Sequence, residues 1–208
     1  MTDATPEPTA PFRDSGRGGV ALVLIDLVNG FDFEGGDTVK AAAEKIVEPV
    51  LRLRAAFDEA DAPTIYVNDN FGEWHSEKTK LVERARATAA DFVRQIAPRE
   101  QDYFVIKPQL SGFYATNLPL LLPKLGVSRL VLTGVATDMC VLFTAGDAHM
   151  RDYASWVPAD AVAAGSASRA EAALEIMRER LGAETRPTSE LDLAGWIASL
   201  GDRAAERS

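Results

Sequence analysis

The chain has 208 residues, of which 47% are hydrophobic and 25% are charged, and its formal net charge is −9. This length and composition are typical of one globular domain with a single core. The acidic balance leaves no excess of Lys and Arg to neutralise phosphates, so neither nucleic acid nor an anionic membrane surface is expected as a partner. No apolar stretch reaches the ~18 residues of a membrane-spanning helix.

The predicted elements begin after a polar segment. Residues 1–18 are rich in Pro and Gly, lack the features of a signal peptide, and are expected to form a disordered N-terminal arm. The apolar run VALVLID at 20–26 then predicts a strand that is covered on both faces, as in a parallel sheet. Helical spacing of apolar residues predicts a helix at 38–60, with a kink or a break at Pro49.

Strands and helices alternate through the rest of the chain. Further strands are predicted at 62–69, 102–108, 128–135 and 153–160, with a short edge strand at 184–188. Further helices are predicted at 81–97, 115–126, 137–152, 168–182 and 189–200, before a frayed tail at 201–208. This alternation, without repeat or internal linker, predicts one domain at 19–200. We expect an α/β fold of the three-layer α/β/α Rossmann-like kind, a mostly parallel sheet of five to six strands with helices on both faces.

Reactive side chains stand at the ends of three predicted strands. Asp26 ends the first strand, Lys107 lies at the end of the third, and Cys140, the only cysteine, comes shortly after the fourth. Right-handed crossovers bring the carboxyl ends of parallel strands to one edge of the sheet. A carboxylate, an ammonium and a thiol are therefore expected to converge there.

Cys140 allows two interpretations. In the first turn of its predicted helix, where Thr137 or Asp138 is available as N-cap, backbone N–H groups and Lys107 would lower the pKa of a nucleophilic thiol. Asp26 would then take the thiol proton as general base, and backbone N–H groups would hold an oxyanion. A lone cysteine in an apolar stretch is, however, often only a packing residue, so these features leave both interpretations open.

Three segments resemble motifs of the isochorismatase-like cysteine hydrolases. They are LVLIDLVNGF at 22–31, IKPQLSGFYATNL at 106–118 and LVLTGVATDMCV at 130–141. They occur in the order and spacing of that family, and together with PTIYVNDNFGEW they cover most of residues 20–170.

The resemblance implies both a fold and a set of site residues. The fold is Rossmann-like, and the catalytic triad corresponds to Asp26, Lys107 and Cys140. The resemblance also implies a cis peptide bond between Val135 and Ala136. The N–H groups of Ala136 and Cys140 would then face the oxyanion.

One segment departs from the nicotinamidases of this family, which carry an Asp-x-His motif and a further His that bind a metal. Here VNDNFGEWHSE holds Asn68, Asp69 and Asn70 and lacks that motif. Asp69 and His75 would make at most half a metal site, a solvated loop is the alternative, and His149 is expected deep in a helix. We therefore expect no metal and no cofactor, and nicotinamide is disfavoured as a substrate.

The cysteine itself narrows the chemistry. True isochorismatases cleave a vinyl ether and lack a cysteine at the position of Cys140. Its presence favours attack at an amide, carbamoyl or ureido C–N bond, as in relatives similar to N-carbamoylsarcosine amidase and ureidoacrylate amidohydrolase. Those relatives tend to hold a substrate carboxylate with an arginine or with polar groups, and the sequence identifies no such residue.

Aromatic side chains gather in the segments that flank the strand ends. As a group they predict an aromatic-walled pocket for a small planar substrate, although core packing explains each of them equally well. They are Phe31, Phe71, Trp74, Phe113 and Tyr114. Asn29 and Asn68 are further candidates for hydrogen bonds to the substrate.

The sequence thus predicts a metal-independent cysteine hydrolase that cleaves a C–N bond of a small molecule through a thioester. Two alternatives stay open: a vinyl-ether hydrolase that uses Asp26, and a non-catalytic small-molecule-binding protein of the same fold. We expect a cytoplasmic protein that forms a homodimer or homotetramer, as family members commonly do, with a neighbouring subunit near the site.

Overall fold

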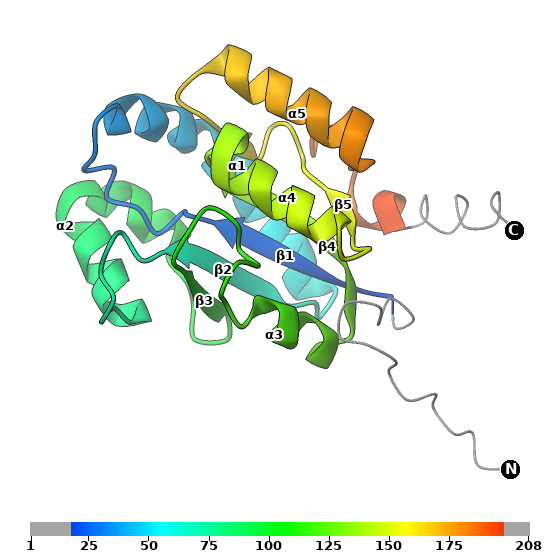
Figure 1. Ribbon diagram of the computed structural model, residues 1–208, viewed down its shortest axis with the longest axis horizontal. Helices are drawn as coiled ribbons and strands as arrows, with labels where there is room; N and C mark the ends of the chain where they lie inside the picture. Colours follow the sequence, from blue (N-terminus) through cyan, green and yellow to red (C-terminus); the bar gives the residue numbers. More distant parts are fainter. Residues whose placement is uncertain (1–17, 198–208) are drawn as a thin grey trace, which may run out of the picture.

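The computed structural model of the protein describes residues 18–197 (Figure 1). The predicted N-terminal arm, apart from Gly18, and the predicted tail at 201–208 lie outside the described residues. Of the last predicted helix, the described part is helical at 193–197. Within residues 18–197, no helix combines the length and the apolar character that crossing a bilayer requires.

Strands and helices alternate as the hydrophobic pattern predicts. The strands are β1 (Gly19–Ile25), β2 (Thr64–Asp69), β3 (Tyr103–Lys107), β4 (Val127–Val135), β5 (Ala154–Trp156) and β6 (Val162–Ala163). The helices are α1 (Gly36–Glu59), α2 (Lys78–Ile96), α3 (Leu118–Lys124), α4 (Leu142–His149) and α5 (Ala167–Leu181), with a short π-helix, η2 (Thr137–Val141), directly before α4.

All six strands pair in parallel in one sheet of order β3-β2-β1-β4-β5, and β6 pairs with β4 beyond the end of β5. The chain first moves outward from β1 to β3 and then returns to the other side of β1 for β4. The order therefore reverses between β1 and β4, the place where α/β sheets hold ligands at the carboxyl ends of the strands.

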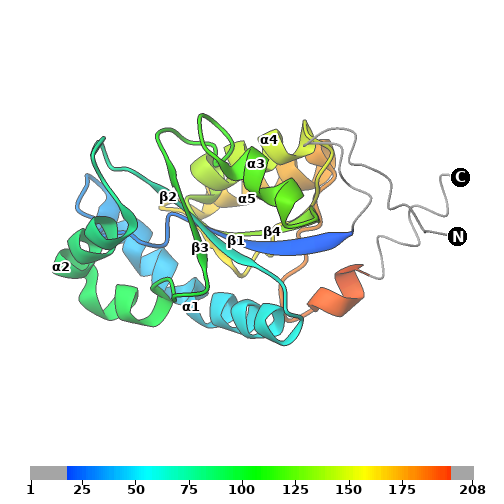
Figure 2. The same cartoon turned by 90° about the horizontal axis from the view of Figure 1, so that it is seen from below.

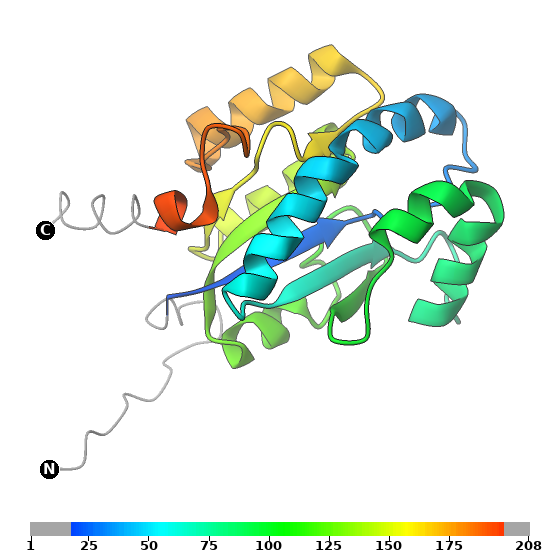
Figure 3. The same cartoon turned by 180° about the vertical axis from the view of Figure 1, so that it is seen from behind.

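Helices cover both faces of the sheet, which confirms the predicted three-layer α/β/α fold. α1 and α2 lie on one face, and α3, α4 and α5 lie on the other (Figures 2 and 3). β1 alternates between the two cores: Leu22 and Leu24 face α1, whereas Val23 and Ile25 belong to the core under α3 and α4. This explains why β1 is a continuous apolar run.

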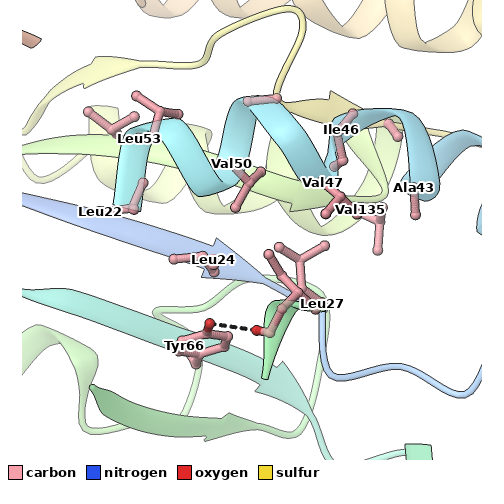
Figure 4. Packing of buried hydrophobic residues seen from close by; sticks show 14 of the residues in the cluster. Leu22, Leu24, Leu27, Ala43, Ile46, Val47, Val50, Leu53, Tyr66 and Val135 are labelled. Carbon is pink, nitrogen blue, oxygen red and sulfur yellow. Dashed lines mark hydrogen bonds between the residues drawn. The ribbon is translucent and has the colours of Figure 1, made fainter. Parts of the chain in front are cut away.

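The core on the α1 face holds the larger side chains. Residues of α1 that recur at helical spacing, among them Ile46, Val50 and Leu53, pack over Leu22 and Leu24 of β1 (Figure 4). The ring of Tyr66 lies in the same core, and its hydroxyl donates to the Ile96 carbonyl at 2.6 Å. α1 and the end of α2 are thereby held against the sheet.

Four predicted elements differ in part from the observed ones. α1 runs unbroken through Pro49, a buried residue on its sheet-facing side, so of the predicted kink or break the break is wrong, and the kink stays a prediction. α2 is interrupted at Ala89, whose φ of −135° and ψ of 46° are not helical, while the neighbouring Thr88 hydroxyl donates to the Gly30 carbonyl at 2.9 Å.

The predicted strand at 153–160 is divided into β5 and β6. Pro158 has no N–H to donate to the ladder, and a turn in which Ala161 N–H donates to the Pro158 carbonyl at 2.9 Å separates the two pieces. The predicted edge strand at 184–188 is reduced to one bridge between Trp156 and Glu184.

Gly134 permits the close approach of β4 to β1 at the site edge. Its φ is +112°, and a Cβ built there would lie 2.0 Å from the Ile25 carbonyl oxygen. Gly134→Ala is therefore expected to lower the free energy of unfolding by at least about 2 kcal/mol, measured by urea denaturation. Gly146→Ala in α4 is the matched control, because a Cβ there meets nothing within 4 Å. An equal effect of both variants would contradict this account of β4.

Candidate active site

The site is built around the buried ammonium of Lys107, at the end of β3. The side chain is fully buried, and its Nζ lies 2.9 Å from Asp26 Oδ2 and 3.2 Å from Asp69 Oδ2. The same Nζ donates to Cys140 Sγ at 3.3 Å and to the Gln109 carbonyl at 3.2 Å. The structure thus brings together the three side chains that the sequence placed at one sheet edge.

Asp26 reaches this position because the chain leaves β1 in a left-handed conformation, with φ of 52°. Its backbone N–H donates to the Val67 carbonyl at 3.0 Å, which continues the pairing of β1 with β2. Its Oδ1 accepts the backbone N–H of Asp69 at 2.6 Å. Both carboxylate oxygens are therefore held, one by a strand neighbour and one by Lys107.

Cys140 lies in η2, the turn that links β4 to α4, and its side chain is partly exposed. The thiol contacts Lys107 Nζ at 3.3 Å, and the Asp26 carboxyl is near enough to influence its pKa. The predicted side-chain caps are absent from this turn: Thr137 Oγ1 is buried without a partner among the described residues, and Asp138 pairs with Arg169 at 2.8 Å.

The protonation of the cluster differs from the sequence-based expectation. Burial raises the pKa of the Cys140 thiol to about 12, and the charge of Asp26 adds to this, while Lys107 acts in the opposite direction. Burial also raises the pKa of the Asp26 carboxyl, against the influence of Lys107. For Lys107, burial lowers the pKa, but Asp26 and the other acidic groups outweigh it and raise the pKa above its ordinary value.

The predicted lowering of the thiol pKa is therefore wrong, because burial outweighs the nearby ammonium. The resting site holds a neutral thiol beside a carboxyl whose raised pKa makes it a stronger base. Proton transfer from Cys140 to Asp26 is then the route to a thiolate.

The peptide bond between Val135 and Ala136 is cis, which confirms the expectation from the resemblance. It joins the end of β4 to η2. The carbonyl of Ala136 accepts the N–H groups of Met139 and Val141 at 3.0 and 3.2 Å. The backbone immediately before Cys140 is thus fixed by the turn that carries the thiol.

Several predicted substrate-binding residues make structural contacts within the described chain. Phe31 is buried and packs edge-to-face on Phe92 at 5.2 Å, in the core under α1 and α2. Asn68 is fully buried; its amide accepts the Val28 N–H and donates to the Val28 carbonyl, both at 3.0 Å. It fastens the loop after β1 to β2. Asn29 likewise accepts the N–H of Phe31 at 2.7 Å.

Phe113 is also buried, with Arg151 stacked 4.9 Å from its ring centre. Two other predicted aromatic residues, Trp74 and Tyr114, are exposed and line a pocket of about 650 Å³. Phe143, which the sequence reasoning missed, lines it too and lies three residues after Cys140, the spacing of one helical turn. Phe71 is half-buried, 6.0 Å from the guanidinium of Arg84.

The pocket adjoins the Lys107 cluster through Pro108 and Gln109. Gln109 lines the pocket, and its carbonyl accepts a hydrogen bond from Lys107 Nζ. The remaining lining is mostly apolar, and Asp147 is its one charged residue. An open, largely apolar hollow therefore lies next to the reactive cluster.

The donor set does not suit a metal ion. Among residues 18–197, no three His, Cys, Asp or Glu side chains are placed to hold one. Asp69, half of the metal site considered above, contacts Lys107 instead, and His75 is exposed in the loop before α2. His149, expected deep in a helix, is exposed at the last position of α4.

Fold and site together define an α/β/α protein with an Asp–Lys–Cys cluster at the carboxyl edge of its sheet. The chain belongs to the isochorismatase domain family, whose model matches residues 20–189.

Relatives cover most of the chain. It is 41% identical over 165 residues to YaaI, an isochorismatase family protein of Bacillus subtilis, with 79% of this chain and 91% of the relative covered. It is 27% identical to the ureidoacrylate amidohydrolase RutB of Methylorubrum extorquens, covering 98% and 90% of the two chains. The crystal structure of N-carbamoylsarcosine amidase from Thermoplasma acidophilum matches with a TM-score of 0.63 and 30% identity, covering 84% of this chain and 99% of that one.

The raised thiol pKa predicts how Cys140 reacts with iodoacetamide. The labelling rate of the folded protein should rise with pH through a midpoint well above that of the urea-unfolded chain, which titrates near 8.5 as a free thiol. Asp26→Asn should lower that midpoint, because it removes the negative charge beside the sulfur. A midpoint in the folded protein at or below that of the unfolded chain would contradict this electrostatic picture. Intact mass measures the labelling, since the chain has one cysteine.

Proposed function

We propose that the protein is a metal-independent cysteine hydrolase that cleaves an amide, carbamoyl or ureido C–N bond of a small molecule through a thioester on Cys140. The observation that carries the proposal is that Lys107 Nζ contacts both Asp26 Oδ2, at 2.9 Å, and Cys140 Sγ, at 3.3 Å. Relatives named as amidohydrolases support a hydrolase that acts on non-peptide C–N bonds.

The contacts suit the first half of such a reaction. Asp26 takes the proton of the Cys140 thiol, and the sulfur forms a bond to the carbonyl carbon of the substrate as the carbonyl π electrons move to oxygen. Lys107, 3.3 Å from the sulfur, stabilises the negative charge that develops there. The backbone N–H groups of Ala136 and Cys140 are the proposed donors to the oxyanion, as the family resemblance implies.

The second half restores the site. The tetrahedral intermediate collapses, the C–N bond breaks, and Asp26 returns its proton to the leaving nitrogen, which leaves an acyl thioester. Asp26 then takes a proton from water, the resulting hydroxide attacks the thioester, and the acid is released while the sulfur regains a proton. The raised pKa of the Asp26 carboxyl fits a group that must both accept and return a proton.

Substitution of the nucleophile tests the proposal. Cys140→Ala and Cys140→Ser should each lower kcat/KM by at least about 10³-fold on a substrate found by screening small amides, carbamoyl compounds and ureido acids. The fold, followed by circular dichroism and thermal melting, should persist. In the wild type, intact mass should detect an acyl group on Cys140.

Met139→Leu is the matched control, since it changes the half-exposed neighbour of Cys140 and should retain activity. Full activity of Cys140→Ala would overturn the mechanism. Turnover of a vinyl ether by that variant would point to the chemistry of Asp26 alone, and binding without turnover by the wild type would point to a binding protein.

A further inference from the structure

Asp69, at the end of β2, is a second carboxylate in the cluster that the mechanism does not use. Its Oδ2 lies 3.2 Å from Lys107 Nζ, and its Oδ1 accepts the N–H of Phe71 at 2.7 Å. Its own backbone N–H holds Asp26 Oδ1 at 2.6 Å. β2 and β3 are paired in register with Asp69 directly beside Lys107, so the sheet itself sets this contact.

Asp69 is the accessible one of the two carboxylates. Its side chain is 28% exposed, whereas that of Asp26 is 7% exposed and that of Lys107 is fully buried. Asp69 is therefore the carboxylate of the cluster that is more accessible to solutes.

Asp69 also decides the total charge of the cluster. Lys107 is the one cation of the cluster, and its Nζ contacts both Asp26 and Asp69. The Asp69 carboxylate therefore adds a second acidic group against a single ammonium. Because the groups are largely removed from water, this charge is weakly screened.

The neighbouring arginines do not offset this charge, because carboxylates already engage them. Within residues 18–197, the arginines that contact the segments around the site pair as follows: Arg84 with Asp32 and Glu73, Arg151 with Asp147, and Arg169 with Asp138. Lys107 also offers little attraction to a substrate carboxylate, because its ammonium already pairs with Asp26 and Asp69. The pocket next to the cluster adds no Lys or Arg to its lining.

We propose that Asp69 is a specificity residue that excludes anionic groups from the reacting carbon, so that the substrate is an amide or ureido compound without a carboxylate beside the scissile bond. This inference rests on the proposed function and deepens it. The carboxylate also offers an acceptor to an N–H or ammonium group of the substrate. Compounds that carry a carboxylate next to the C–N bond are therefore expected to be poor substrates of this protein.

Alkylation of Cys140 by two matched reagents tests the proposal without a known substrate. Iodoacetamide is neutral and iodoacetate is anionic, and both transfer a two-carbon group with loss of iodide. The measured quantity is the ratio of their rates with the folded protein, at one alkaline pH, divided by the same ratio for the urea-unfolded chain. For the wild type, this preference for iodoacetamide should be at least about tenfold.

Asp69→Asn should bring the preference to within about threefold of the unfolded reference, because it removes one negative charge and keeps an acceptor for the Phe71 N–H. Asp91→Asn removes the same charge from the exposed surface of α2 and should leave the wild-type preference unchanged. Asp69→Ser provides a second neutral variant if Asp69→Asn does not melt cooperatively.

Equal preference in the folded and unfolded wild type, or an unchanged preference in both neutral variants, would overturn the role of Asp69 while leaving the nucleophile in place. A folded protein that reacts with neither reagent, although the unfolded chain reacts with both, would overturn the proposed function and this inference with it. The two failures are therefore distinguishable.

Discussion

The full burial of the Lys107 ammonium is the constraint on which the site depends. A charge without water needs opposite charges and hydrogen-bond acceptors within contact distance, and here the neighbouring segments supply them. The end of β1 contributes Asp26, the end of β2 contributes Asp69, and the loop after β3 contributes the Gln109 carbonyl. The register of three parallel strands is thereby tied to one side chain. Cys140, which follows β4 on the other side of β1, contacts the same ammonium.

The same burial shapes the chemistry. Burial and the neighbouring Asp26 raise the pKa of the Cys140 thiol, so the thiol keeps its proton. Its reactivity then depends on a base that accepts the proton while the new bond forms. The cluster is therefore better described as a proton-sharing pair next to a fixed cation than as a preformed thiolate. The resting state therefore differs from that of cysteine sites in which a helix N-terminus or a neighbouring cation lowers the pKa and stabilises a thiolate before the substrate binds.

Much of this arrangement was predictable from the sequence, because it follows from chain order. Apolar runs identify the strands, right-handed crossovers align their ends, and Asp26 and Lys107 stand at two of those ends. The environment of each side chain was less predictable. Phe31 lies in a loop that no periodicity describes, the partner of Asn68 is Val28 in that same loop, and the net shift of the Cys140 pKa depends on burial. The exposure of Phe143 follows only once the helix after Cys140 is oriented.

The place of β1 in the sheet has a consequence for synthesis of the chain on the ribosome. Its register partners in β4, such as Gly134 opposite Ile25, are separated from it by more than a hundred residues of sequence. A growing chain that has made β1, β2 and β3 therefore carries its most apolar strand as an open edge, ready to pair with another nascent copy. Emergence of β4 both closes that edge and delivers Cys140. That edge of β1 is thus closed at the point in translation when the chain first holds Asp26, Lys107 and Cys140.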